Sequence, residues 1–119
     1  MATEVTIDDL ADAINHGAYV LDVREQEEYD EAHNHGAYVL DVREQEEYDE
    51  AHVPGVTLIP LGELEQRIHE VEDGSRVFVI CRSGARSLKG ADILEANGID
   101  AVSVAGGTMG WIASGRATE

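Results

Sequence analysis

Residues 76–87 read RVFVICRSGARS and join two predicted elements through one short turn. The run 76–80 is apolar after Arg76 and rich in β-branched residues, which is typical of a buried central strand. The residues after the turn predict a helix whose core side carries Leu88, Ala91 and Leu94. Cys81, the only cysteine of the chain, is therefore expected at the first position of a strand-to-helix turn.

The rest of the chain also alternates between predicted strands and helices. Further strands are predicted at 57–60, at 101–104, and at either 18–23 or 37–42, which have the same sequence. A first helix begins after Thr6, which forms a capping-box pattern with Asp9, and is expected to end at Gly17 or Gly36. Further helices are predicted in the acidic stretch EQEEYDEAH, at 61–71 with an end at Gly74, up to Asn97-Gly98, and after Gly106-Gly107 around Trp111.

This alternation predicts an α/β fold in which a mostly parallel central sheet has helices on both faces. A chain of 119 residues has room for one hydrophobic core, so we expect a single domain over 1–119. Ligand sites in such sheets lie at the carboxyl ends of the strands. Cys81 follows the strand 76–80 directly and is therefore expected at the functional edge of the sheet.

The composition excludes several classes of partner. The formal net charge is −17, and nucleic acids and anionic membrane surfaces repel such an acidic protein. No apolar run is long enough to span a membrane, and the N-terminus lacks the basic and apolar segments of a signal peptide. We therefore expect a cytoplasmic protein that binds neither nucleic acid nor membrane. A single cysteine also excludes an internal disulfide and a zinc site built from several cysteines.

The turn after the strand 76–80 has the features of an anion-binding cradle. Backbone N–H groups of a strand-to-helix turn converge on one point, and the helix dipole adds positive potential there. Arg82 and Arg86 add two positive charges, although the chain has only 8 Lys and Arg in total. Gly84 permits a backbone angle that larger residues resist. We therefore expect Cys81 to be a reactive thiol with a lowered pKa rather than an inert buried one.

Two adjacent segments of the chain are identical. Residues 15–33 and 34–52 both read NHGAYVLDVREQEEYDEAH. Solenoid repeats diverge in sequence and usually need several copies to stack, so a recent or engineered duplication explains the pattern better. One copy is expected to fill the strand, and the other to be surplus to the fold. We expect the surplus copy either to be buried in a homodimer by strand exchange or to form a disordered or helical loop.

Four segments, taken in order along the chain, resemble the rhodanese family of sulfurtransferases. Residues 81–86, CRSGAR, are similar to the six-residue active-site loop of the family, and LDVRE, at 21–25 and 40–44, is similar to its second strand. Residues 51–56, AHVPGV, and 105–111, AGGTMGW, are similar to its His-(Ile/Val)-Pro-Gly-Ala and Gly-Gly…Trp segments. The resemblance covers the whole chain apart from one copy of the repeat, and four motifs in order are far more specific than any one alone.

The resemblance implies a single-domain rhodanese-like fold with about five strands and a sulfurtransferase mechanism. Cys81 would attack the outer sulfur of an anionic donor such as thiosulfate, and the persulfide would then pass its sulfur to cyanide or a thiol acceptor. The donor would bind to the loop residues Arg82, Ser83, Gly84, Ala85 and Arg86, through their backbone N–H groups and the two arginine side chains. No metal ion or organic cofactor is implied.

Two other functions are compatible with the loop. A related Cys-dependent phosphatase would have five residues rather than four between its Cys and Arg, and commonly a His at the position of Ile80. A noncatalytic rhodanese-like binding or regulatory module often lacks the cysteine that this chain retains. Turnover of thiosulfate separates the three functions.

Other polar residues are expected to have structural roles. Asp41 and Arg43, or their twins Asp22 and Arg24, are predicted to form a buried ion pair. His52 is expected to bond the backbone in a turn. The acidic stretches are interpreted as solvated helix faces, and a metal pair formed by the two repeat histidines, His16 and His35, is not expected.

Overall fold

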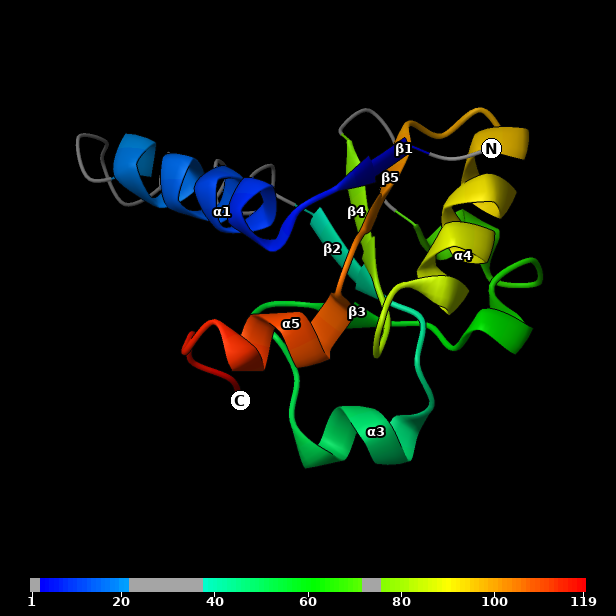
Figure 1. Cartoon of the computed structure of the whole chain (residues 1–119). Coiled ribbons are helices and arrows are strands. Elements are labelled where there is room, and N and C mark those ends of the chain that lie inside the picture. Colours follow the sequence, from blue (N-terminus) through cyan, green and yellow to red (C-terminus); the bar gives the residue numbers. More distant parts are fainter. Residues whose placement is uncertain (1–2, 22–37, 72–75) are drawn as a thin grey trace.

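A five-stranded sheet forms the centre of the protein in a computed structural model that describes residues 3–21, 38–71 and 76–119 (Figure 1). The strands lie in the order β1-β5-β4-β2-β3, and every pair of neighbours is parallel. Their bounds are β1 Thr3–Val5, β2 Tyr38–Asp41, β3 Thr57–Leu58, β4 Val77–Ile80 and β5 Ala101–Val104. The predicted α/β fold with a parallel central sheet is thus confirmed.

Helices cover both faces of this sheet (Figure 1). Their bounds are α1 Ile7–Leu21, α3 Gln45–Glu50, α4 Ala85–Ala96 and α5 Gly107–Ala113, and the 3₁₀ turns are η1 Leu61–Glu63 and η2 Ile68–Glu70. Side chains alternate along β4, so Val77 and Val79 pack with α4 in one core layer. Ile80 and Phe78 pack with Leu10 and Trp111, from α1 and α5, in the other layer. No helix in the described part of the chain is both long and apolar enough to cross a membrane.

The second copy of the repeat supplies the strand and the acidic helix. Residues 38–41 form β2 between β3 and β4, and residues 45–50 form α3. The beginning of the first copy, residues 15–21, belongs to α1 instead. The rest of that copy lies outside the described residues, and so does the segment on which the expected strand exchange in a homodimer depends.

The prediction that Gly17 ends the first helix is wrong. The predicted capping box is present, because the Thr6 hydroxyl accepts the Asp9 N–H and the Asp9 carboxylate accepts the Thr6 N–H, both at 3.0 Å. The helix α1 then continues through Gly17 to Leu21. A glycine inside a helix costs only about 1 kcal/mol relative to alanine, and extending a helix that has already started is far easier than starting one, so α1 can pass through Gly17. Gly36, the other expected end, lies outside the described residues.

The predicted helix at 61–71 is also wrong. The segment forms two separate 3₁₀ turns, and Arg67 between them has left the helical region with φ −108° and ψ 18°. The 3₁₀ turns still bring Leu64 and Val71 into the core next to α4. The apolar spacing therefore predicts the buried residues, but not the type of helix. Gly74, the expected end of this helix, lies outside the described residues. The short edge strand β1 is not predicted from the sequence.

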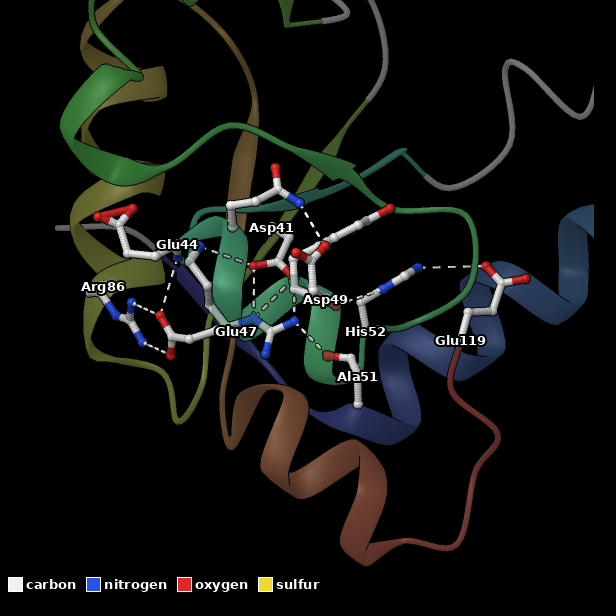
Figure 2. A network of polar contacts seen from close by, with 11 residues as sticks. Asp41, Glu44, Glu47, Asp49, Ala51, His52, Arg86 and Glu119 are labelled. Carbon is white, nitrogen blue, oxygen red and sulfur yellow. Dashed lines mark hydrogen bonds and ion pairs between the residues drawn. The ribbon is translucent and has the colours of Figure 1, made fainter.

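A buried ion pair lies at the carboxyl end of β2, as predicted. The Arg43 side chain donates to both carboxylate oxygens of Asp41, at 2.8–3.1 Å, and also to the Ala51 carbonyl oxygen at 2.8 Å (Figure 2). Asp41 is 0% exposed, and Arg43 is the cation in direct contact with its carboxylate. The pair therefore connects the end of β2 to the residue that follows α3.

The repeat offers a matched control for this ion pair. Asp41→Asn should lower the free energy of unfolding by about 3–5 kcal/mol, because it leaves the buried charge of Arg43 uncompensated. Asp22→Asn makes the same change in the same local sequence, and we expect it to stay within about 0.5 kcal/mol of the unmodified chain. Urea denaturation followed by circular dichroism measures both. Equal destabilisation by the two variants would contradict the assignment of β2 to the second copy.

Candidate active site

Cys81 lies directly after β4, at the carboxyl end of the sheet, where sites form in folds of this class. Its side chain is 1% exposed and belongs to the core layer under α4. The Gly84 N–H donates to the Cys81 Sγ at 3.1 Å, and the Ser87 hydroxyl oxygen lies 3.4 Å from the same sulfur. The loop between β4 and α4 therefore curls around the sulfur atom.

Gly84 allows this curl. It is the N-terminal cap of α4 and has φ +120° and ψ −16°, a conformation that side chains with a Cβ rarely adopt. Its N–H consequently points back at Cys81 rather than along the helix. The expectation that Gly84 occupies a special backbone angle is confirmed.

The N-terminus of α5 holds the loop from outside. The Thr108 N–H donates to the Cys81 carbonyl oxygen at 2.8 Å, and the Met109 N–H donates to the Arg82 carbonyl oxygen at 3.0 Å. These two amides lie in the first turn of α5, where N–H groups have no partner within the helix. Gly107 makes the approach feasible, because a Cβ at this position would lie 2.5 Å from the Cys81 carbonyl oxygen.

The surroundings of Cys81 favour its thiolate. Burial raises the pKa of the thiol, but hydrogen bonds from the Ser87 hydroxyl and from the backbone N–H groups of Ser87, Gly84 and Ser83 outweigh it, so the pKa is lowered. This agrees with the pKa expected from the sequence. The backbone donors lie at the start of α4, where the helix dipole also favours negative charge.

The two arginines of the loop have different surroundings. Arg86 forms a bidentate ion pair with Glu47 of α3, with N–O distances of 2.7 and 2.9 Å (Figure 2). The Arg82 side chain is exposed, and its Nε lies 3.3 Å from the Met109 sulfur. Ser83 and Ala85 are exposed residues of the same loop. Of the predicted loop residues, Gly84 contacts the Cys81 sulfur directly, whereas the Arg82 side chain lies against Met109 and Arg86 is already engaged by the Glu47 carboxylate.

Three contributors to this site are not evident as such from the sequence. Glu47 belongs to a stretch expected to be a solvated helix face, but its carboxylate is half-buried against Arg86. Ser87 of α4 and Ser103 of β5 have no predicted role, although both lie in a helix or strand that the sequence predicts. The Ser87 hydroxyl is close to the local motif and could be recognised there, whereas nothing in the local sequence around Glu47 or Ser103 indicates the contact.

The histidine expectation is confirmed. The His52 Nδ1 lies 2.9 Å from the Tyr48 carbonyl oxygen, and its ring stacks on that of Tyr48 with centroids 3.8 Å apart. His52 therefore binds a carbonyl near the C-terminal end of α3 and is not part of the Cys81 site. Within residues 3–21, 38–71 and 76–119, no three His, Cys, Asp or Glu side chains are grouped as metal ligands.

Comparison with known proteins gives a consistent result. The rhodanese-like domain family matches residues 30–114. Two Bacillus subtilis proteins are similar in sequence. YtwF, named provisionally as a sulfurtransferase, is 34% identical over 78% of this chain and 72% of its own length. YrkF, named provisionally as a sulfur carrier protein, is 40% identical over 77% of this chain, which spans only 40% of the length of YrkF.

Solved structures are similar over nearly the whole chain. A rhodanese-related protein from Thermoplasma volcanium has a TM-score of 0.78 and 26% identity, covering 98% of this chain and 97% of that one. A rhodanese-like domain protein from Staphylococcus aureus has a TM-score of 0.70 and 28% identity, covering 92% and 90%.

The contact between α5 and the loop can be tested with Gly107→Ala. The added Cβ must displace the Cys81 and Arg82 carbonyls, so we expect a loss of about 2–4 kcal/mol in unfolding free energy and a rise in the pKa of Cys81 toward that of a free thiol. Gly98→Ala is the control, because Gly98 has φ +80° but no atom within 4 Å of the point that its Cβ would occupy. It should cost only about 1–2 kcal/mol and leave the thiol unchanged. Equal effects on the thiol in both variants would contradict the proposed support by α5.

The ion pair between Glu47 and Arg86 predicts a pH-dependent stability. Its partner arginine lowers the pKa of Glu47 to about 2, so the pair stabilises the fold above the ordinary value of 4.5 and loses its effect as the pH falls toward 2. At pH 7, Glu47→Gln should cost about 1 kcal/mol, because both side chains are partly solvated. The twin variant Glu28→Gln should cost less than about 0.5 kcal/mol. Denaturation at pH 7, 4 and 2 should show the difference between the variants shrinking; a constant difference would contradict the ion-pair assignment.

Proposed function

The chain belongs to the rhodanese-like domain family, and on this premise we propose that it is a sulfurtransferase that carries sulfane sulfur on Cys81. The observation that carries the proposal is the Cys81 Sγ at the N-terminus of α4, where it accepts the Gly84 N–H at 3.1 Å and has a lowered pKa. A thiolate held by oriented N–H groups is the nucleophile that such chemistry needs. The provisional names of YtwF and YrkF, as a sulfurtransferase and a sulfur carrier protein, point to the same class of reaction.

The proposed reaction has two half-reactions, in which Cys81 first takes a sulfur atom from the donor and then passes it to the acceptor. In the first, the Cys81 thiolate attacks the outer sulfur of thiosulfate, a sulfur–sulfur bond forms to Cys81, and sulfite leaves with the electron pair of the broken sulfur–sulfur bond. In the second, cyanide or a thiolate attacks the outer sulfur of the persulfide, and the Cys81 thiolate leaves. The backbone N–H groups at the start of α4 would stabilise the negative charge on the outer sulfur between the two steps.

The donor is proposed to be a small anion. A chain with a net charge of −17 repels anions at long range, so a local basic site must compensate. Arg82 is exposed beside the loop, and Arg86 keeps N–H groups that its two bonds to Glu47 do not use. We propose that both arginines contact the donor, with Glu47 holding Arg86 in place.

We further propose that residues 1–119 form one rhodanese-like domain in which the first repeat copy is an insertion. The family match begins at residue 30 and includes the second copy, which supplies β2 and α3. Closure of an inserted loop costs only a few kcal/mol, so the domain can tolerate it. A chemistry that depends on one free thiol also favours a reducing compartment such as the cytoplasm.

The test is the intact mass of the protein after incubation with thiosulfate. The unmodified chain should gain the mass of one sulfur atom, and cyanide should remove it with release of thiocyanate. Cys81→Ser should gain nothing. A chain without residues 15–33, which is the single-copy sequence, serves as the matched control for the duplication.

The outcomes separate the alternatives. Sulfur loading of the single-copy chain alone would support the function and show that the duplication impairs it. No loading of either chain, with both folded, would contradict the sulfurtransferase function and favour a binding module, or a phosphatase if an aryl phosphate were hydrolysed.

A further inference from the structure

A second buried hydroxyl lies behind Ser87. Ser103 of β5 and Ser87 of α4 are both 0% exposed, and their hydroxyl oxygens are 2.8 Å apart. Ser87 in turn lies 3.4 Å from the Cys81 Sγ. Sulfur, Ser87 and Ser103 therefore form a continuous chain from β4 through α4 to β5. Among the described residues, Ser87 is the one side chain within hydrogen-bond distance of the Ser103 hydroxyl.

The protons of this chain have one complete arrangement while Cys81 is a thiol. The Ser87 hydroxyl donates to the Gly84 carbonyl oxygen at 3.0 Å. The Ser87 oxygen then accepts from both neighbours, the thiol of Cys81 and the hydroxyl of Ser103. Every hydroxyl proton has an acceptor, as buried polar groups require.

Loss of the thiol proton favours a different arrangement. The thiolate can only accept, so the Ser87 oxygen loses the donor on that side, and the Ser87 proton can turn from the Gly84 carbonyl to the sulfur. The Gly84 carbonyl keeps a partner when this happens, because it also accepts the Leu88 N–H at 3.3 Å in the first turn of α4. The Ser87 oxygen keeps a donor only if Ser103 supplies one.

We propose that Ser103 is a positioning residue: it donates to the Ser87 oxygen and thereby leaves the Ser87 proton free to turn to the Cys81 sulfur when the thiol ionises. Ser87 touches the reacting sulfur, whereas Ser103 acts through Ser87. The inference deepens the proposed function, because sulfur transfer needs the thiolate. Its test, however, follows ionisation of the thiol and does not require turnover of any sulfur donor.

Charged groups near the sulfur remain the same in the variants that test this idea. Within the described residues, Arg86 of α4 interacts with Cys81 electrostatically, and Asp41 of β2 and Glu47 of α3 interact with Arg86. Arg43 is paired with Asp41, and Arg82 is the neighbour of Cys81 in the chain. The strands β4 and β5 and the helix α5 contain no titratable side chain. Differences between hydroxyl variants therefore report on the hydroxyls.

The experiment follows the ultraviolet absorbance of the thiolate as a function of pH. Cys81 is the only cysteine, so subtraction of Cys81→Ser removes the tyrosine contribution. Ser87→Ala should raise the midpoint by about one pH unit, and Ser103→Ala by about half a unit, because each weakens a hydrogen bond to or toward the charged sulfur. The double variant should match Ser87→Ala alone, because Ser103 has no effect without Ser87.

A structural control separates positioning from packing. Val102→Ala removes buried volume from the opposite side of the same strand and should lower Tm at least as much as Ser103→Ala, with an unchanged midpoint. An unchanged midpoint in Ser103→Ala would overturn the proposal, as would shifts of Ser87→Ala and Ser103→Ala that add in the double variant. If Ser103→Ala does not fold, an unchanged midpoint in Ser87→Ala alone overturns it as well.

Discussion

The site depends on two hydrogen bonds between backbones that are far apart in the sequence. The first N–H groups of α5, from Thr108 and Met109, bind the carbonyl oxygens of Cys81 and Arg82. With these carbonyls directed at α5, the following N–H groups of the loop face the sulfur, and Gly84 donates to it at 3.1 Å. The close contact also explains why position 107 requires a glycine, because a Cβ there would lie 2.5 Å from the Cys81 carbonyl oxygen. The conformation of the Cys81 loop and the position of the first turn of α5 are therefore linked through these two hydrogen bonds.

Charge is distributed unevenly in this acidic protein. The net charge is −17, yet two arginines form ion pairs near the carboxyl ends of the strands, where the candidate site lies. Arg43 neutralises Asp41 in the core, and Arg86 joins α4 to α3 through Glu47. Both acidic partners come from the second copy of the repeat, so that copy provides part of the electrostatic environment of Cys81 as well as a central strand.

The repeat shows how much tertiary context determines local structure. The sequence Tyr-Val-Leu is helical at 19–21, in α1, and extended at 38–40, in β2. In α1 these residues continue a helix that a capping box has already started. In β2 they pair with β4 on one side and with β3 on the other, and the interstrand hydrogen bonds favour the extended form. Identical residues thus adopt different structures because their neighbours differ.

The sequence by itself determined the parallel α/β class, the strand β4, the unusual backbone angle at Gly84 and the position of Cys81, because each depends on residues close together in the chain. The sequence did not indicate that Glu47 binds Arg86, that Ser103 lies behind Ser87, or that α5 supports the loop. Nor did it distinguish the 3₁₀ turns at 61–71 from one helix, since the apolar spacing of both is similar. Such features arise when strands align and bring distant backbone and side-chain groups within hydrogen-bond distance, so only the tertiary structure decided them.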